Sequence, residues 1–162
     1  MSNKGKLSPQ PNFKLSPIGP GVAYGHAYAK NTSIVIAIAV ANTAYEIGAG
    51  LTAGKLTDVV FGGNHYLQVK KAGSYLINYN VSMDATLSDE IESGVMVNGS
   101  EATEGGSHTS DAVLAASSNT SGSCILELVE NDQVSLYVRN HTGANAITVE
   151  HVNLTIYKIP GT

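Results

Sequence analysis

Apolar and polar residues alternate with a period of two through most of the chain beyond Val22, which is the pattern of β-strands that bury one face. The clearest case is residues 74–83, where every odd-numbered position is apolar and all but one of the even-numbered positions are serine or asparagine. No window of 12 residues places apolar side chains along one side of a helix. The pattern therefore predicts an all-β body.

Similar alternation elsewhere brings the total to about ten short strands, enough for a two-layer sandwich. A hairpin is expected where the runs 124–128 and 134–138 flank a turn at 130–132. Asn98-Gly99 suits a tight turn of two residues, and Asp132 can cap a turn through its carboxylate. The further strands are expected at Val22–Ala29, Ser33–Val40, Thr43–Ile47, Asp58–Phe61, Tyr66–Lys70, Ile91–Val97, Ala112–Ala116 and Ala146–Ile159.

The last strand is apolar on both of its alternating sets. Val152, Leu154 and Ile156 make up one set, and the other set consists of Ile147, Val149, Tyr157 and Ile159. One face can meet the core, whereas the other needs a second sheet, a bulge that exchanges the faces, or another subunit. We favour a subunit. The residues predicted to form the core or the subunit contact are Tyr75, Ile77, Tyr79, Leu136, Leu154, Ile156 and Tyr157.

The first 21 residues differ in composition from the rest of the chain. They hold four of the five prolines, and their three lysines come without any acid, which gives them a charge of +3. Six cations and 13 acids remain from residue 22 onward, so the body carries −7. We expect an extended arm, residues 1–21, followed by one domain, residues 22–162. A flexible leader or tag remnant is the alternative interpretation of the arm.

Composition excludes several classes of function. Charged residues make up 14% of the 162, the net charge is −4, and no broad basic surface is available to bind nucleic acid. The most apolar stretch, 34–41, spans about a third of a membrane-crossing helix. Cys124 is the only cysteine, so it cannot form an intramolecular disulfide, and its phase predicts a buried position. The N-terminus lacks the apolar segment of a signal peptide, so we expect synthesis in the cytoplasm.

The chain offers little catalytic or metal-binding chemistry. None of the five histidines forms an H-x-H or H-x3-H pair, and no nucleophile elbow fixes a base beside a serine. We therefore expect neither an enzyme nor a cofactor. The segment 72–138 has no Lys or Arg and is predicted to carry an acidic, solvated surface. Calcium is the alternative for one part of it, because Asp84, Asp89, Glu90 and Glu92 supply clustered oxygen ligands, although their spacing matches no EF-hand.

The order of these elements resembles the tumour-necrosis-factor/complement-type jelly-roll superfamily over residues 22–159. Four segments carry the resemblance: 66–82 with its V-x-x-x-G-x-Y pattern, 95–99 with its Asn-Gly turn, 121–138 with L-x-x-x-D-x-V, and the closing strand 152–159. The segments 24–28, 41–45 and 148–159 are more similar to phage virion proteins and spore-surface tips than to animal signalling domains. No collagen-like Gly-X-Y tract precedes the domain, unlike in many complement and spore-surface relatives.

The resemblance implies a homotrimeric jelly roll, and we hypothesise a capsid decoration or head-fibre protein of a tailed phage, located on the virion surface. Its partners would be other copies of itself and the major capsid protein or another virion protein. A glycan- or receptor-binding tip of a phage fibre or spore-surface protein is the alternative, with a host surface glycan as partner. The arm residues expected to anchor the trimer are Lys4, Lys6, Pro9, Pro11, Phe13, Lys14, Pro17 and Pro20.

Overall fold

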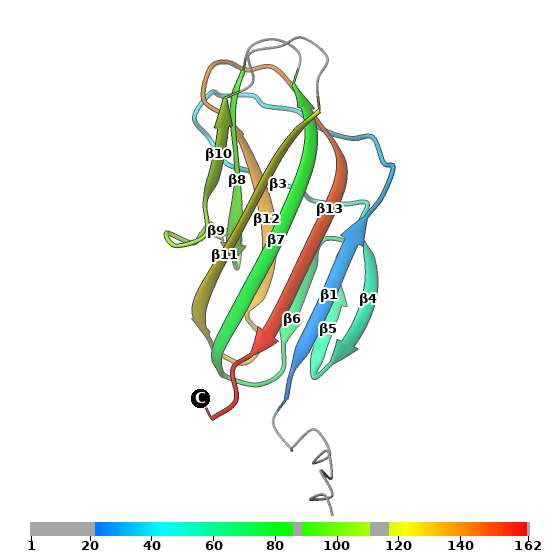
Figure 1. Cartoon of the computed structure of the whole chain (residues 1–162), viewed down its shortest axis with the longest axis vertical. Helices are drawn as coiled ribbons and strands as arrows, with labels where there is room; N and C mark the ends of the chain where they lie inside the picture. The colour runs from blue at the N-terminus through cyan, green and yellow to red at the C-terminus, as the bar shows by residue number, and fades with distance from the viewer. Residues whose placement is uncertain (1–21, 86–88, 111–116, 162) are drawn as a thin grey trace, which may run out of the picture.

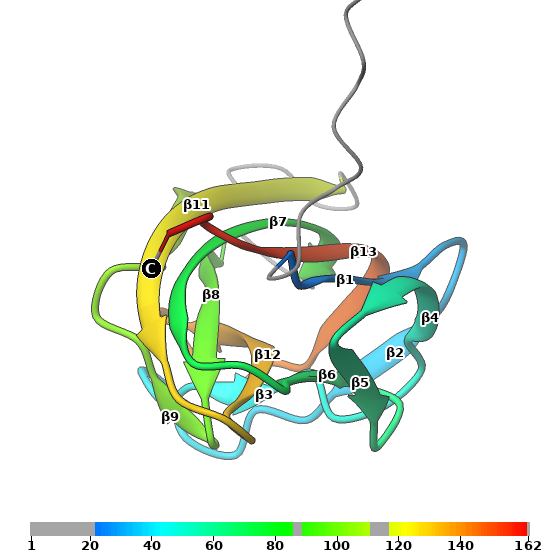
Figure 2. The ribbon, with the colours of Figure 1, turned by 90° about the horizontal axis from the view of Figure 1, so that it is seen from below.

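The computed structural model describes residues 22–85, 89–110 and 117–161, and this part of the chain is a sandwich of two antiparallel sheets with a jelly-roll arrangement (Figures 1 and 2). The described residues form 13 strands and no helix, hence none long and apolar enough to cross a membrane. The first sheet has the order β11-β7-β13-β1-β4, with β2 beside β13. The second has the order β10-β8-β12-β6-β5, with β3 beside β12 and β9 beside β8.

The strands of the first sheet are β1 (Tyr24–Ala29), β2 (Ile34–Ile36), β4 (Thr52–Thr57), β7 (Gly73–Ala85), β11 (Ser118–Leu128) and β13 (Ile147–Lys158). Those of the second sheet are β3 (Tyr45–Glu46), β5 (Val59–Gly62), β6 (Tyr66–Val69), β8 (Glu90–Val97), β9 (Ser100–Glu101), β10 (Ser107–Ser110) and β12 (Gln133–Asn140). The prediction of an all-β sandwich is confirmed.

The core fills the space between the two sheets and contains nearly all the side chains assigned to it from the sequence. On β7 the odd-numbered positions from Tyr75 to Met83 are all buried. Leu136 of β12 reaches the same core from the opposite sheet, as do Leu154 and Ile156 from β13. Tyr157 is the exception. Its side chain is 38% exposed and lies on the outer face of the first sheet, so of the two positions expected for it the core is excluded, and the subunit contact stays a prediction.

A β-bulge in β13 accounts for most of the two-sided apolar pattern of that strand. The pairing of β13 with β7 shifts register between Val149 and His151, so the alternation changes phase at that point. Ile147 and Val149 before the bulge and Val152 after it are all fully buried in the same core. Most of the two-sided pattern that led us to favour a neighbouring subunit is therefore explained by the bulge, which turns Ile147 and Val149 to the core side, while Tyr157 stays on the outer face.

The segments 124–128 and 134–138 do not form the predicted hairpin. Strand β11 pairs with β7 in the first sheet, whereas β12 pairs with β8 in the second, so the turn carries the chain from one sheet to the other. Asp132 stabilises this crossing as expected. Its Oδ2 accepts a hydrogen bond from the backbone N–H of Val129 at 2.8 Å, and its Oδ1 accepts one from the side-chain amide of Asn98 at 2.8 Å.

Several local predictions are confirmed, and three strands were missed. Asn98 and Gly99 adopt φ of 53° and 76° and connect β8 to β9 as a tight two-residue turn. The missed strands are β4, β9 and β10, of which β4 is an edge strand whose Thr-Ala-Gly-Lys-Leu-Thr sequence lacks apolar alternation. The strand expected at Ala112–Ala116 lies outside the described residues.

Gly122 leaves space that the buried Tyr79 ring occupies. The two residues are paired between β11 and β7, and a Cβ on Gly122 would lie 2.6 Å from the Tyr79 hydroxyl oxygen. That hydroxyl donates a hydrogen bond to the Ser93 carbonyl at 3.0 Å, so the ring cannot move away freely. We expect Gly122→Ala to lower the free energy of unfolding by about 1–3 kcal/mol, measured by urea denaturation. In Gly48→Ala, where the nearest atom is 3.9 Å away, we expect almost no change.

Candidate functional site

Four apolar or aromatic side chains form a continuous row across the outer face of the first sheet. The strand register aligns Tyr24 with Tyr157, Tyr157 with Leu76, and Leu76 with Ile125, so the row crosses β1, β13, β7 and β11. Ile125 is 57% exposed and Tyr157 is 38% exposed, and the other two are partly exposed. We call these four residues the apolar row. Such a row on an open sheet face is a surface that association with another molecule would bury.

Toward the other end of the strands the same face becomes polar. The next rows carry His26 and Tyr28, whose rings stack with centroids 5.3 Å apart, and the side chain of Asn153, 3.4 Å from the His26 ring. Asn80 donates from its side-chain amide to Asn119 at 2.8 Å. The face therefore combines one apolar end with a larger surface of amide and hydroxyl groups, which form hydrogen bonds with a partner or with water.

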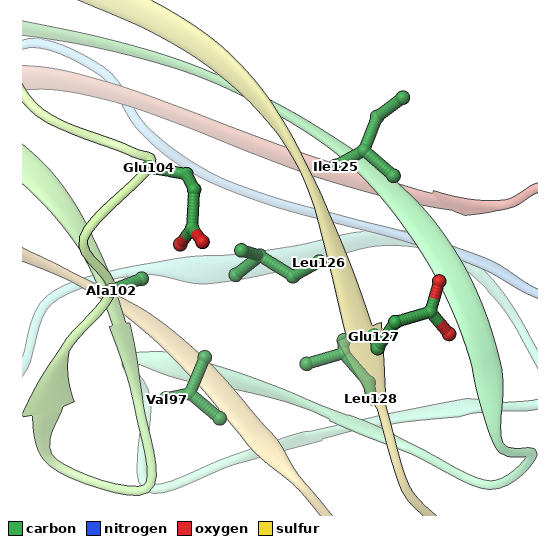
Figure 3. A pocket seen from close by; sticks show the side chains of 7 residues that line it. All are labelled: Val97, Ala102, Glu104, Ile125, Leu126, Glu127 and Leu128. Atoms are coloured by element: carbon green, nitrogen blue, oxygen red, sulfur yellow. The ribbon is translucent and has the colours of Figure 1, made fainter.

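A groove of about 430 Å³ lies beside β11, at the same end of the sandwich as the apolar row (Figure 3). Leu126 and Leu128 of β11 face Val97 and Ala102 across it, and Glu104 extends its carboxylate over this apolar floor toward Leu126. The neighbouring Ile125 and Glu127 complete the lining from β11, although their side chains point to the other side of that strand. The groove is thus apolar with an acidic rim.

The second sheet carries a network of charged side chains around Glu92 of β8. Tyr137 of β12 donates a hydrogen bond to Glu92 Oε1, and Arg139 Nη1 and His141 Nε2 approach Glu92 Oε2 at 3.0 Å and 2.8 Å. Arg139 also pairs with Glu101. Tyr137, Arg139 and His141 are each at least 45 residues away from Glu92 in the sequence. The network therefore ties β8 to β12 and pairs two of the acids predicted to make the segment 72–138 acidic with the single charge of Arg139.

The network changes the pKa values of its members. Burial raises the pKa of the Glu92 carboxyl, but the hydrogen bonds from Tyr137 and His141 and the charge of Arg139 outweigh it and hold that pKa below its ordinary value. Burial, followed by the bond to Glu92, raises the pKa of Tyr137. In the core, burial raises the pKa of Tyr79 to about 12. Neither tyrosine ionises at neutral pH, so both act as hydrogen-bond donors.

Glu92 makes stability depend on pH. A carboxyl whose pKa is lower in the folded state contributes stability that is fully present above the unfolded value and is lost as the pH falls through the folded value. We expect Glu92→Gln to lower the free energy of unfolding by about 1–3 kcal/mol at pH 7 and by less near pH 3. Urea denaturation at the two pH values measures this difference, and an equal loss at both would contradict the role of the Glu92 charge.

The four carboxylates considered for calcium are used separately. Glu92 binds Arg139 and His141, and Glu90 lies 2.6 Å from the His108 ring. Asp89 is buried beside the Asn145 amide at 3.3 Å, and Asp84 stands on β7. No group of three or more histidine, cysteine or acidic side chains able to hold a metal occurs in residues 22–85, 89–110 and 117–161. The calcium hypothesis was wrong for this part of the chain, because Asp89, Glu90 and Glu92 face separate protein donors and Asp84, whose buried Oδ1 has no hydrogen-bond partner, is not grouped with them.

The remaining candidates divide between the described residues and the arm. Cys124 is buried as predicted, and burial together with Glu104 raises the pKa of its thiol, which disfavours the reactive thiolate. The anchoring residues of the arm lie outside the described residues. The sequence interpretation missed the apolar row, although a signal was present, because Leu76 and Ile125 are apolar side chains in the polar phase of their strands. No comparable signal pointed to the groove.

A search among known structures finds jelly-roll domains similar to this chain. Eiger, a tumour-necrosis-factor protein of S. frugiperda, has a TM-score of 0.61 and 14% identity, covering 87% of this chain and 94% of that chain. Murine APRIL has a TM-score of 0.57 and 14% identity, covering 85% and 99%. The globular domain of zebrafish complement 1qA has a TM-score of 0.56 and 11% identity, covering 85% and 96%. No model of a known family and no curated protein matches the sequence.

Proposed function

We propose that this chain, which has the jelly-roll fold of tumour-necrosis-factor and complement-type domains, is a non-enzymatic structural protein of a tailed-phage particle that forms a homotrimer on the capsid surface. The apolar row on the outer face of the first sheet is the observation that carries the assembly. The phage setting rests on the similarity of segments 24–28 and 41–45 to virion proteins and on the basic arm. The protein would be made in the host cytoplasm.

The apolar row supports self-association through its energetics. Each square ångström of apolar surface removed from water contributes roughly 25 cal/mol, and the row exposes parts of two tyrosines, a leucine and an isoleucine. The polar rows beside it supply hydrogen bonds that fix the orientation of the copies. Three copies arranged around an axis through these faces would cover all three rows at once.

The position of the arm supports attachment to a shell. The described part of the chain begins at residue 22, two residues before Tyr24 in the apolar row. The three arms of a trimer would therefore all emerge at the same end of the particle. Each arm carries +3, and three arms bound together gain avidity without any new contact. The major capsid protein or another virion protein would be the partner of Lys4, Lys6 and the prolines around them.

A second candidate function is recognition of a host glycan or receptor by the tip of a fibre. The stacked pair of His26 and Tyr28 beside Asn153 favours it, because an exposed aromatic ring with amide groups next to it can bind a sugar. The polar span 98–122 adds hydroxyl groups. A glycan array separates the two functions, since selective binding of one glycan class is expected of a recognition module and not of a decoration protein.

Two measurements test the proposal. Light scattering should return a particle of about 50 kDa, three times the chain mass of 16.8 kDa, at micromolar concentration. Deletion of residues 1–11, which hold Lys4, Lys6 and two of the arm prolines, should leave this trimer intact and abolish its co-sedimentation with capsids. A particle of chain mass would contradict the trimer. Full capsid occupancy by the truncated trimer would instead show that the arm is not the anchor.

A further inference from the structure

No described residue fills the groove beside β11. The side chains that line the groove indicate what kind of ligand could bind there. Its floor is formed by Val97, Ala102, Leu126 and Leu128, which is apolar throughout. Glu104 extends over that floor and has no cation partner within the described part of the chain. All groove residues fall in the segment 72–138, which contains no Lys or Arg. A suitable ligand is therefore an extended peptide that presents apolar side chains together with a cation.

The chain itself contains such a segment. Residues 13–15 read Phe-Lys-Leu, so an extended backbone places Phe13 and Leu15 on one side and Lys14 on the other. The two apolar side chains match the floor, and Lys14 can reach the carboxylate of Glu104 at the rim. The arm carries three of the nine Lys and Arg residues of the protein, and no acid competes with them there.

The arm also starts in the right place. Residue 22 enters β1 beside the apolar row, and the opposite end of that row, Ile125, is part of the groove lining. Three strand spacings separate β1 from β11, or about 14 Å across the sheet. The nine residues from 22 back to 13 reach about 30 Å when extended, which is about twice that distance across the sheet.

We propose that the groove beside β11 binds residues 13–15 of the arm of a second copy of the chain. The inference rests on the proposed homotrimer. The path along the first sheet from residue 22 to the groove of the same chain follows the apolar row, which the proposed assembly buries. Exchange between copies avoids this path. It secures each subunit to its neighbour and leaves residues 1–11, with Lys4 and Lys6, for the capsid.

Trypsin provides the first test, because two of the three lysine sites in the arm, Lys6–Leu7 and Lys14–Leu15, have the same Lys-Leu sequence. In the full-length trimer we expect cleavage after Lys14 to be at least about tenfold slower than after Lys6. Glu104→Lys should abolish this protection, so that cleavage after Lys14 becomes as fast as cleavage after Lys6. Glu90→Lys, an exposed acid at the far end of β8, is the matched control and should leave the protection unchanged.

Disulfide trapping identifies which copy supplies the arm. Differently tagged copies carrying Lys14→Cys and Glu104→Cys, all with Cys124→Ala to remove the native thiol, are mixed, co-assembled and oxidised, and we expect a disulfide that joins the two tags. Val60→Cys, an exposed site on β5, replaces Glu104→Cys in the control and should give none. A trimer without the mixed disulfide, or with equal cleavage after Lys6 and Lys14, would overturn the proposed exchange and leave the homotrimer standing. A particle of chain mass would overturn both.

Discussion

Leu136→Asp should leave the protein unfolded at 25 °C. Leu136 is 1% exposed in the core between the two sheets, where a carboxylate would have neither water nor a cation to replace it. The penalty for an unpaired buried charge is several kcal/mol, comparable with the total stability of about 5–15 kcal/mol of a single domain. Tyr75→Asp, at a fully buried position on β7, should have the same effect.

Circular dichroism and urea denaturation measure this loss against two matched variants. Leu136→Ala removes volume without adding charge and should cost about 2–5 kcal/mol while leaving a folded protein. Val35→Asp adds the same carboxylate at a position that is 65% exposed on β2 and should change stability by less than about 0.5 kcal/mol. A native spectrum for Leu136→Asp would contradict the assignment of β12 to the core.

Leu76→Asp should convert the trimer to a folded monomer. Leu76 lies in the middle of the apolar row, and its side chain points away from the core, so the change does not disturb packing inside one subunit. Around a three-fold axis the substitution places three carboxylates in the contact region, where their burial and mutual repulsion oppose association. We expect the affinity between subunits to fall at least about a hundredfold, equivalent to about 3 kcal/mol.

Size-exclusion chromatography with light scattering distinguishes the two states. The variant should elute with the 16.8 kDa mass of one chain while its far-ultraviolet circular dichroism stays that of the folded protein. Val60→Asp is the control, because Val60 is 41% exposed on β5 of the second sheet, away from the apolar row, and it should remain trimeric. A Leu76→Asp trimer would show that the outer face of the first sheet is not the contact.

The sequence predicted the local features well because each depends on neighbouring residues. Alternation along 74–83 assigned the buried face of β7 without knowledge of its partners, and Asn98-Gly99 specified a turn through its own backbone preference. Asp132 caps a turn within four residues of itself. Features of this kind are determined by the chemistry of one short segment and remain the same whatever packs against it.

The errors arose where distant segments meet. The sequence of β13 suggests a strand that is apolar on both faces. A bulge shifts its alternation, and this bulge becomes visible only in the pairing of β13 with β7. Similarly, β11 and β12 follow one another through a short turn but belong to different sheets. The network around Glu92 depends on Arg139 lying opposite it, 47 residues along the chain. Alternation does not specify which strand becomes the neighbour.

The sequence by itself determined the class of the fold, the inward face of most strands and the separation of a basic proline-rich arm from an acidic body. Only the tertiary structure decided the register that aligns Tyr24, Tyr157, Leu76 and Ile125. It also decided that β11 lies opposite Val97 and Ala102, which forms the groove. The physical reason is that strand faces follow from a period of two within a few residues. Register follows from packing between residues as far apart as 24 and 157, which becomes defined only when the whole core is formed.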